Sequence, residues 1–228
     1  MLYTILTYIY QWMFGSSELV IYSIEGNIGA GKTVLFNELR RKLRGFDYCF
    51  IEEPLDVWEQ ITDTTGRNIL ECFYEDKHKY AMTMQITALI TRYERIYDAM
   101  KNGARNIIIE RSLDCDHYVF ASALHDEGYI DDVSWEAYKK WNDIFTSRMP
   151  APKIIYLDTP PDVCMERIRL RDRAGEANVT LELIEKYDLC HRKWLSTVRR
   201  TRHLDLLNVS HNDTFFDQIK AVLEYILW

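Results

Sequence analysis

One eight-residue segment constrains the fold of this 228-residue chain more than any other. Gly26–Thr33 reads GNIGAGKT, and it follows the apolar run Leu19–Ile24 and opens the helical pattern Lys32–Leu43. The pattern GxxxxGK[ST] between a strand and a helix is typical of a loop whose backbone N–H groups surround phosphate oxygens. Glycines permit the tight curl, and the N-terminus of the helix adds positive potential. The segment predicts a strand–loop–helix unit whose phosphate contacts are Gly26, Asn27, Ile28, Gly29, Ala30, Gly31, Lys32 and Thr33.

Two side chains of this loop have specific chemistry. In such loops the lysine, here Lys32, reaches the β- and γ-phosphates, and the hydroxyl of Thr33 can bind Mg²⁺. A glycine-rich turn that merely begins a helix is the competing interpretation, and the strand before the loop disfavours it. The chain has no NKxD sequence of the kind a switch GTPase uses to read its base, and it is short for a motor ATPase. The sequence therefore favours a small phosphotransferase.

Short apolar runs alternate with longer amphipathic stretches along the chain. The runs are β-branched or aromatic and end in polar residues, as buried strands do: Leu19–Ile24, Tyr48–Ile51, Asn106–Ile109, Lys153–Leu157 and His203–Leu207. Helical patterns cover Lys32–Leu43, Arg67–Met100, Asp114–His125, Val133–Arg148, Pro161–Arg171, Leu181–Arg200 and Thr214–Leu227. This alternation predicts an α/β fold with a five-stranded parallel sheet flanked by helices. Its active site should lie at the carboxyl ends of the strands.

Charge and cysteine usage narrow the classes of partner and compartment. With 28 basic and 35 acidic residues the net charge is −7, so we expect no nucleic-acid partner, and an anionic substrate would need a local cluster of cations. The five cysteines contain no CxxC pair and the six histidines no HExxH pair, which disfavours a disulfide framework and a zinc site. We expect an intracellular and cytoplasmic protein, with nucleus and mitochondrion left open.

The first residues differ from the rest of the chain. Met1–Phe14 is apolar and aromatic and has no charged side chain. It lacks the basic region of a signal peptide, and it is shorter than the roughly 20 residues of a membrane-spanning helix. We favour a cap packed on the core or on a partner subunit, with a weak membrane contact as the alternative. We therefore divide the chain into an apolar extension, residues 1–18, and one domain, residues 19–228.

Charged residues follow the second and third expected strands. Glu52 and Glu53 precede Pro54, and two carboxylates at a strand end suggest an acid or base that faces the site, with a solvated acidic turn as the alternative. Glu110 and Arg111 follow the third strand. A carboxylate there can hold Mg²⁺, directly or through water, and the arginine can clamp a transferring phosphoryl group. An ordinary capping turn is the alternative at this second position.

Four motifs, GNIGAGKT, EEPLDVW, IIIERS and ERIRLRDR, occur in an order and spacing found in one known family. In these motifs the chain resembles the deoxyribonucleoside kinase family, in its deoxycytidine and deoxyguanosine kinase-like branch, from about Leu19 to the C-terminus. The resemblance implies a P-loop kinase fold with a small arginine-rich lid at about residues 167–177. It also implies ATP as phosphoryl donor, Mg²⁺ as cofactor, and a homodimer packed through helices near Arg67–Met100 and Val133–Arg148.

The same resemblance implies roles for single residues. Glu53 looks like the general base on the nucleoside 5′-hydroxyl, and Arg111 like the arginine near the 5′-oxygen. Tyr74 is similar to the tyrosine that holds the sugar 3′-hydroxyl, and Gln85 to the glutamine that pairs with the base edge. Core packing is the alternative for the aromatic residues. Residues that resemble the lining of the base pocket are Trp58, Phe73, Ala88 and Phe120.

Two positions bear on the choice of base. Arg92 lies seven residues after Gln85 and Asp116 four residues after Ser112, which resembles the deoxycytidine and deoxyguanosine kinase-like branch. Such a pair would present fixed polar groups to a base edge and crowd the 5-methyl group of thymine. Leaving a buried polar group unpaired costs about 1–3 kcal/mol, so we expect deoxycytidine and purine deoxynucleosides to be preferred over thymidine. A helix-surface ion pair of Arg92 with a neighbouring carboxylate, Glu94 or Asp98, is the alternative.

Arginines recur within ERIRLRDRAGEA although the chain as a whole is acidic. As a plain helix this would be a solvated basic face, but as a lid it would stabilise charge on the donor phosphates. Glu176 matches the lid glutamate near the sugar 3′-hydroxyl, and Asp213 lies in a segment that resembles the donor-base loop. That segment departs from the family's usual sequence, so the choice between ATP and other triphosphates stays open. The phosphate contacts implied by the family pattern are Arg169, Arg171 and Arg173.

Several other functions remain alternatives. A thymidine-preferring or multisubstrate deoxynucleoside kinase would share every motif except the Arg92–Asp116 pair. A nucleoside monophosphate kinase would need extra basic groups near Glu53, where the sequence is acidic. A non-catalytic nucleotide-sensing subunit would keep the phosphate loop but would have no use for Glu53, Tyr74 and Gln85 together.

Overall fold

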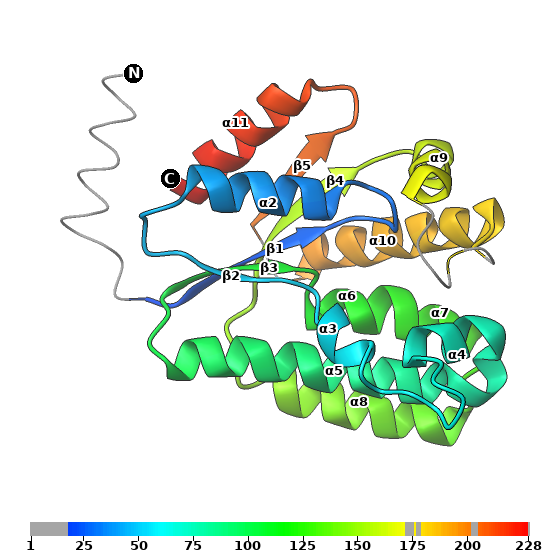
Figure 1. Ribbon diagram of the computed structural model, residues 1–228. Coiled ribbons are helices and arrows are strands. Elements are labelled where there is room, and N and C mark those ends of the chain that lie inside the picture. Colours follow the sequence, from blue (N-terminus) through cyan, green and yellow to red (C-terminus); the bar gives the residue numbers. More distant parts are fainter. Residues whose placement is uncertain (1–17, 172–175, 177–178, 202–204, 228) are drawn as a thin grey trace, which may run out of the picture.

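Five parallel strands form a single sheet at the centre of the molecule (Figure 1). The computed structural model describes residues 18–171, 176, 179–201 and 205–227, so almost all of the expected extension and Arg173 lie outside the described residues. The strand order is β2-β3-β1-β4-β5, and the prediction of a five-stranded parallel sheet is confirmed. The strands are β1 (Val20–Glu25), β2 (Cys49–Ile51), β3 (Asn106–Glu110), β4 (Lys153–Asp158) and β5 (Leu206–Ser210).

The register brings the ends of three strands to one edge. Ile24 of β1 pairs with Glu110 of β3, and Ile51 of β2 pairs with Ile109 of β3. Because the strands are parallel, the segments that follow β1, β2 and β3 all leave the sheet at this edge. The phosphate loop and the acidic and basic residues expected at a site thereby become neighbours.

Helices cover both faces of the sheet (Figure 1). One face carries α2 (Lys32–Lys42) and α11 (Phe215–Leu227), and the other carries α5 (Lys77–Lys101), against which α8 (Asp132–Thr146) packs. The prediction of helices flanking the sheet is therefore confirmed. The remaining elements are α3 (Leu55–Trp58), α4 (Ile69–Glu75), α6 (Leu113–Cys115), the π-helix η1 (Asp116–Ala121), α7 (Ser122–Asp126), α9 (Pro161–Arg171) and α10 (Leu181–Thr201).

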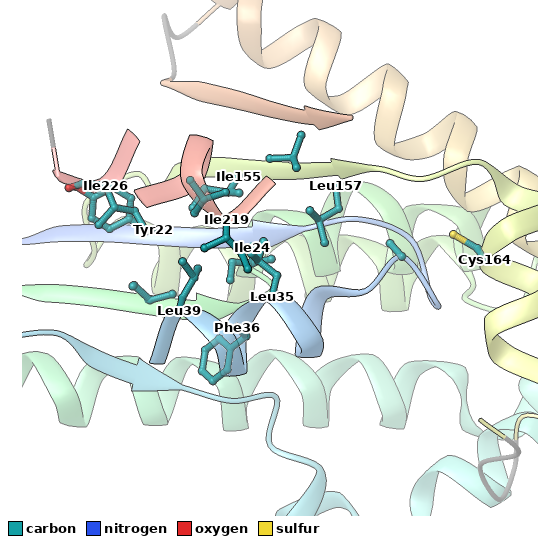
Figure 2. Packing of buried hydrophobic residues seen from close by; sticks show 14 of the residues in the cluster. Tyr22, Ile24, Leu35, Phe36, Leu39, Ile155, Leu157, Cys164, Ile219 and Ile226 are labelled. Carbon is teal, nitrogen blue, oxygen red and sulfur yellow. The ribbon is translucent and has the colours of Figure 1, made fainter. Parts of the chain in front are cut away.

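The largest apolar cluster lies between the sheet and the pair α2 and α11 (Figure 2). Burial of each large aliphatic side chain there contributes about 1.5–3 kcal/mol relative to exposure. This packing fixes α2 against β1 and so holds the loop that joins them. Members of the cluster include Ile24, Leu35, Phe36, Leu39, Ile155, Ile219 and Val222.

The helix expected over Arg67–Met100 is wrong as a single element. Asp76 interrupts it with non-helical backbone angles, φ −139° and ψ 88°, and its side chain accepts a hydrogen bond from the N–H of Lys79 to cap α5. An aspartate that caps a new helix competes with continuation of the preceding one. The result is the separate helix α4, which lines the site described below.

Two further boundaries differ from expectation. The last strand, Leu206–Ser210, continues past the expected end at Leu207 because its backbone keeps pairing with β4 through the polar residues Asn208 and Ser210, and the expected start at His203 lies outside the described residues. The helix expected over Asp114–His125 is α6, η1 and α7 in succession. Short π-helical segments occur frequently at functional sites. No helix among the described residues is both long and apolar enough to cross a membrane.

Candidate active site

A cavity of about 610 Å³ opens at the carboxyl ends of β1, β2 and β3. It is bounded by the phosphate loop, by α3, α4 and α5, and by η1 and α9. The sequence-predicted residues that line it are Ile28, Gly29, Gly31, Lys32, Thr33, Glu53, Trp58, Phe73, Tyr74, Gln85, Ala88, Arg92, Glu110, Arg111, Asp116, Phe120, Arg171 and Glu176. The topology thus gathers into one space residues that lie up to about 150 positions apart in the chain.

The remaining expected residues lie elsewhere. Gly26, Asn27 and Ala30 belong to the loop but do not line the cavity, and Asn27 instead donates a hydrogen bond from Nδ2 to the carbonyl of Ile184 at 2.7 Å. Arg169 and Asp213 are exposed and are not part of the cavity lining. Arg173 lies outside the described residues. The roles expected of Arg169 at the donor phosphates and of Asp213 in the donor-base loop stay predictions.

The phosphate loop packs closely against α9. Gly29 has φ +79°, and a Cβ there would lie 2.4 Å from the carbonyl oxygen of Cys164. Ala30 offers its carbonyl oxygen to the guanidinium of Arg167 at 2.9 Å and to the hydroxyl of Thr159 at 3.1 Å. The glycine is required both by its left-handed backbone and by this close approach. The loop therefore packs directly on α9, and a side chain at position 29 would not fit.

Lys32 is buried at the base of the loop. Its ammonium donates hydrogen bonds to the carbonyls of Gly26 and Asn27 at 3.1 and 2.9 Å. Burial, reinforced by the neighbouring positive charge of Arg111, lowers the pKa of Lys32 to about 8. The lysine therefore remains mostly protonated at neutral pH and can offer its charge to an anion in the cavity.

Thr33 and Glu110 meet across the mouth of the loop. The Thr33 hydroxyl donates to Glu110 Oε1 at 2.7 Å. Hydroxyl and carboxylate oxygens are the ligands that Mg²⁺ prefers, and this ion commonly takes one or two protein groups together with substrate phosphates. The two residues therefore fit such an ion. Among the described residues no group of three or more His, Cys, Asp and Glu side chains could hold a metal ion by itself.

Glu53 lies between two arginines. Its Oε1 is 3.2 Å from an Nη atom of Arg92 and 3.5 Å from Nε of Arg111. Burial alone would raise the pKa of Glu53, but Arg111, Arg92 and Lys32 outweigh it and hold the pKa at about 2. The carboxylate is therefore ionised throughout the neutral range.

Arg92 is 2% exposed, although it belongs to the long helix α5. Its Nε donates to Asp116 Oδ2 at 2.8 Å, and its Nη1 donates to the carbonyl of Glu110 at 2.9 Å. A helix-surface ion pair with Glu94 or Asp98 is therefore wrong. Because every terminal group of Arg92 already contacts the protein, the arginine fixes the orientation of Asp116 in the cavity wall.

Aromatic side chains shape the part of the cavity beyond Glu53. Trp58 is buried and donates from Nε1 to the hydroxyl of Thr91 at 3.0 Å. The guanidinium carbon of Arg111 lies 4.2 Å from the ring centroid of Phe120. Burial, together with the charge of Glu176, raises the pKa of Tyr74 to about 12, so its hydroxyl stays neutral. Flat walls of this kind fit a planar ring.

One residue at the phosphate end was expected as part of the arginine-rich lid but not among its phosphate contacts. Arg167 lines the cavity and contacts the loop, while Arg171 lies one helical turn further on and pairs with Glu176, with Nε 3.1 Å from Oε2. Arg169 lies between them on α9 and cannot share their face, since side chains four residues apart align on a helix and those two apart do not. Helical spacing pairs Arg167 with Arg171 and equally Arg169 with Arg173, so the sequence alone does not show which pair faces the loop.

Comparison with known proteins agrees with this geometry. The family model of deoxynucleoside kinases matches residues 22–226. The chain is 40% identical to a probable deoxycytidine kinase of fowlpox virus over 76% of this chain and 71% of that one. It is 28% identical to human deoxycytidine kinase over 90% of this chain and 88% of that one, and 27% identical to a mitochondrial deoxyguanosine kinase of Xenopus laevis over 83% and 77%. The chain belongs to the deoxynucleoside kinase family.

Proposed function

We propose that this deoxynucleoside kinase transfers the γ-phosphoryl group of ATP to the 5′-hydroxyl of deoxycytidine and of purine deoxynucleosides, in preference to thymidine, in nucleotide salvage. The observation that carries the preference is the buried Arg92–Asp116 pair in the cavity wall. The names of the relatives, deoxycytidine kinase and deoxyguanosine kinase, agree with it.

Polar groups near the Arg92–Asp116 pair are available to the nucleobase of a substrate. The Oε1 atom of Gln85 is buried in the cavity wall and has no hydrogen-bond partner among the described residues. A buried acceptor without a donor costs about 1–3 kcal/mol, which an amino group on a base edge would relieve. Asp116 offers a second acceptor, held in place by Arg92. Two acceptors suit the exocyclic amino groups of cytosine and of the purines, whereas thymine has none.

The reaction needs a general base, and Glu53 is that base. As an ionised carboxylate it takes the proton of the 5′-hydroxyl while the oxygen attacks the γ-phosphorus and the bond to the β-phosphate oxygen breaks. Lys32, Arg111 and Arg167 supply positive charge where negative charge is spread over the transferring group. Thr33 and Glu110 would hold Mg²⁺, which when bound neutralises charge on the donor phosphates.

We further propose a homodimer formed through α5 and α8. Tyr97 of α5 and Trp141 of α8 are 44% and 49% exposed, and a chain of ring contacts joins them through Tyr93 and Phe145. A connected apolar surface of this kind is typical of an interface. Light scattering after gel filtration should give twice the chain mass for the native protein and the chain mass for Trp141→Glu, and a native monomer would exclude the dimer.

The location inside a cell that we propose is the cytoplasm, in line with five free thiols.

A phosphoryl-transfer assay tests the proposed reaction directly. With ATP and Mg²⁺, the enzyme should phosphorylate deoxycytidine, deoxyadenosine or deoxyguanosine with kcat/KM at least tenfold above that for thymidine. dCMP and dTMP serve as controls. Thymidine as the best substrate would overturn the base preference but not the reaction, whereas activity on the monophosphates alone would overturn both.

A further inference from the structure

A buried carboxylate that has no part in this mechanism lies behind the active site. Glu25 is the last residue of β1, its side chain is fully buried, and it is not part of the cavity lining. Its Oε1 accepts hydrogen bonds from the hydroxyl of Ser23 and from the backbone N–H of Ser112, the latter at 2.9 Å. Its Oε2 has no hydrogen-bond partner among the described residues. A carboxylate buried with one oxygen unsatisfied is costly, so it calls for a function.

The turn that Glu25 contacts has an unusual backbone. Arg111 has φ +71°, the only positive φ among the described residues that are not glycine. Its N–H donates to the carbonyl of Ile24 at 3.1 Å, and the next N–H along the chain, that of Ser112, donates to Glu25. Ile24 and Glu25, which are consecutive in β1, therefore accept hydrogen bonds from the consecutive N–H groups of Arg111 and Ser112. A left-handed conformation at a bulky residue persists only where its surroundings impose it.

The backbone conformation decides where the Arg111 side chain points. In the left-handed turn the guanidinium lies over Phe120, and its Nε is 3.5 Å from Glu53. Rotation of φ to a negative value would redirect the Cα–Cβ bond, and the guanidinium would leave this position. A catalytic cation displaced by about 1 Å can lower a rate by about 100-fold. The hydrogen bond between Glu25 and Ser112 thus bears on the position of the Arg111 guanidinium through the backbone of this turn.

We propose that Glu25 is a positioning residue for phosphoryl transfer: by accepting the N–H of Ser112, it holds Arg111 in its left-handed conformation and so places the guanidinium beside Glu53. The inference rests on the role proposed above for Arg111. In this proposal Glu25 acts through its hydrogen bond to the backbone rather than through the attraction between its charge and Arg111, which also helps to raise the pKa of Arg111.

Two substitutions separate the hydrogen bond from the charge. Glu25→Gln keeps an acceptor oxygen at the same reach and removes the charge, whereas Glu25→Asp keeps the charge but is one methylene too short to reach Ser112. We expect kcat to fall roughly 10- to 100-fold in Glu25→Asp and to stay within about threefold of the native value in Glu25→Gln, with the KM for ATP changed less than kcat. Ser23→Ala, which removes only the other donor to Glu25, is the matched control and should resemble the native enzyme. Thermal unfolding confirms that each variant is folded, and Glu25→Met replaces the aspartate variant if that one is not.

A double-mutant cycle shows whether Glu25 acts through Arg111. In an Arg111→Ala background, Glu25→Asp should cause no further loss of kcat, because the side chain that it positions is gone. The same fold-loss in both backgrounds would overturn the inference, as would a Glu25→Gln enzyme slower than the aspartate variant. A native-like kcat in Arg111→Ala alone would instead overturn the role proposed for Arg111, and the two failures are therefore distinguishable.

Discussion

At the scale of single residues, Glu53 is the side chain whose removal should separate binding from chemistry. Its carboxylate is held ionised by Arg92 and Arg111, and glutamine has the same shape but cannot take a proton. We predict that Glu53→Gln lowers kcat by roughly 10²–10⁴-fold and leaves the Kd for ATP nearly unchanged. Steady-state kinetics and calorimetric titration with ATP measure the two quantities.

The neighbouring carboxylate provides a control for this prediction. Glu52 precedes Glu53 in the chain, but its side chain is 51% exposed and pairs with Arg40 on α2. Glu52→Gln should therefore retain kcat within about threefold, since an exposed ion pair is worth little. Equal losses in the two variants, or an unchanged kcat in Glu53→Gln, would exclude Glu53 as the base.

Arg92 and Asp116 should be replaced together to test base selection. Asp116→Ala alone leaves a buried guanidinium without its main partner, and loss of one member of a buried pair typically costs about 3–5 kcal/mol. Arg92→Leu with Asp116→Ala removes both charges, so the double variant should be more stable than the single one. We predict that the ratio of kcat/KM for thymidine to that for deoxycytidine rises at least tenfold in the double variant. Continued exclusion of thymidine in a folded double variant would show that other residues select the base.

Residue identities at the site were predictable from sequence where a strand end or a motif fixes their location. Glu53 and Arg111 line the cavity as expected because they come within two residues of the ends of β2 and β3, and Lys32 does so because the phosphate-loop motif places it at the start of α2. The arginine run was harder, since alternate spacing suits any helical phase. Only the contact between Arg167 and the carbonyl of Ala30 reveals which face of α9 meets the loop.

At the scale of elements, the contact between the phosphate loop and α9 can be tested at one glycine. A methyl group on Gly29 would meet the carbonyl oxygen of Cys164 at 2.4 Å and Ile168 Cγ1 at 3.1 Å. Backbone atoms of a helix cannot yield as a flexible side chain does, so the loop itself must distort. We predict that Gly29→Ala raises the Kd for ATP at least tenfold, measured by calorimetric titration.

A second glycine isolates this contact from backbone strain. Gly45 has φ +91°, close to the value at Gly29, but a Cβ there would meet nothing within 4 Å. Gly45→Ala should therefore incur only the strain of a left-handed alanine, about 1 kcal/mol, which lowers Tm by about 2–4 °C in a chain of this size. Its Kd for ATP should not change. Similar ATP affinities in the two variants would mean that the close approach at Gly29 has no part in nucleotide binding.

Element types followed from periodicity, but element boundaries did not. The helical spacing of apolar residues between Arg67 and Met100 continues through Asp76, so the pattern alone cannot show that the side chain of Asp76 caps a new helix. The break matters for function, because it lets α4 turn Phe73 and Tyr74 into the cavity. Likewise, β5 ends where pairing with β4 ends rather than where apolar residues stop.

At the scale of the whole molecule, charged groups of both signs gather in one cavity. The net charge of the chain is −7, yet the five cations Lys32, Arg92, Arg111, Arg167 and Arg171 line the same space as the five carboxylates Glu52, Glu53, Glu110, Asp116 and Glu176. Parallel topology favours this gathering, since it brings segments after separate strands to one edge. Sequence composition could predict that local cations were needed, but the fold shows how they converge: Lys32 and Arg111 come after β1 and β3, whereas Arg92, Arg167 and Arg171 reach the cavity from α5 and α9.

Stability of the whole molecule should decline in acid because two histidines are held neutral in the folded state. Burial lowers the pKa of His191 to about 3 and that of His117 to about 4, against about 6.5 for an unfolded chain. Below pH 6.5 the unfolded chain binds protons that the native state does not, so the free energy of unfolding falls by up to about 1.4 kcal/mol per pH unit for each histidine. Glu53, whose pKa of about 2 is depressed, adds a loss of the same sign below about pH 4.5.

Urea unfolding between pH 7 and 5 should show this decline in the free energy of unfolding. His191→Gln should roughly halve the slope of the decline with pH, while His78→Gln, at an exposed position, should leave the slope unchanged. A native protein whose unfolding free energy is flat over this range would show that neither buried imidazole resists protonation.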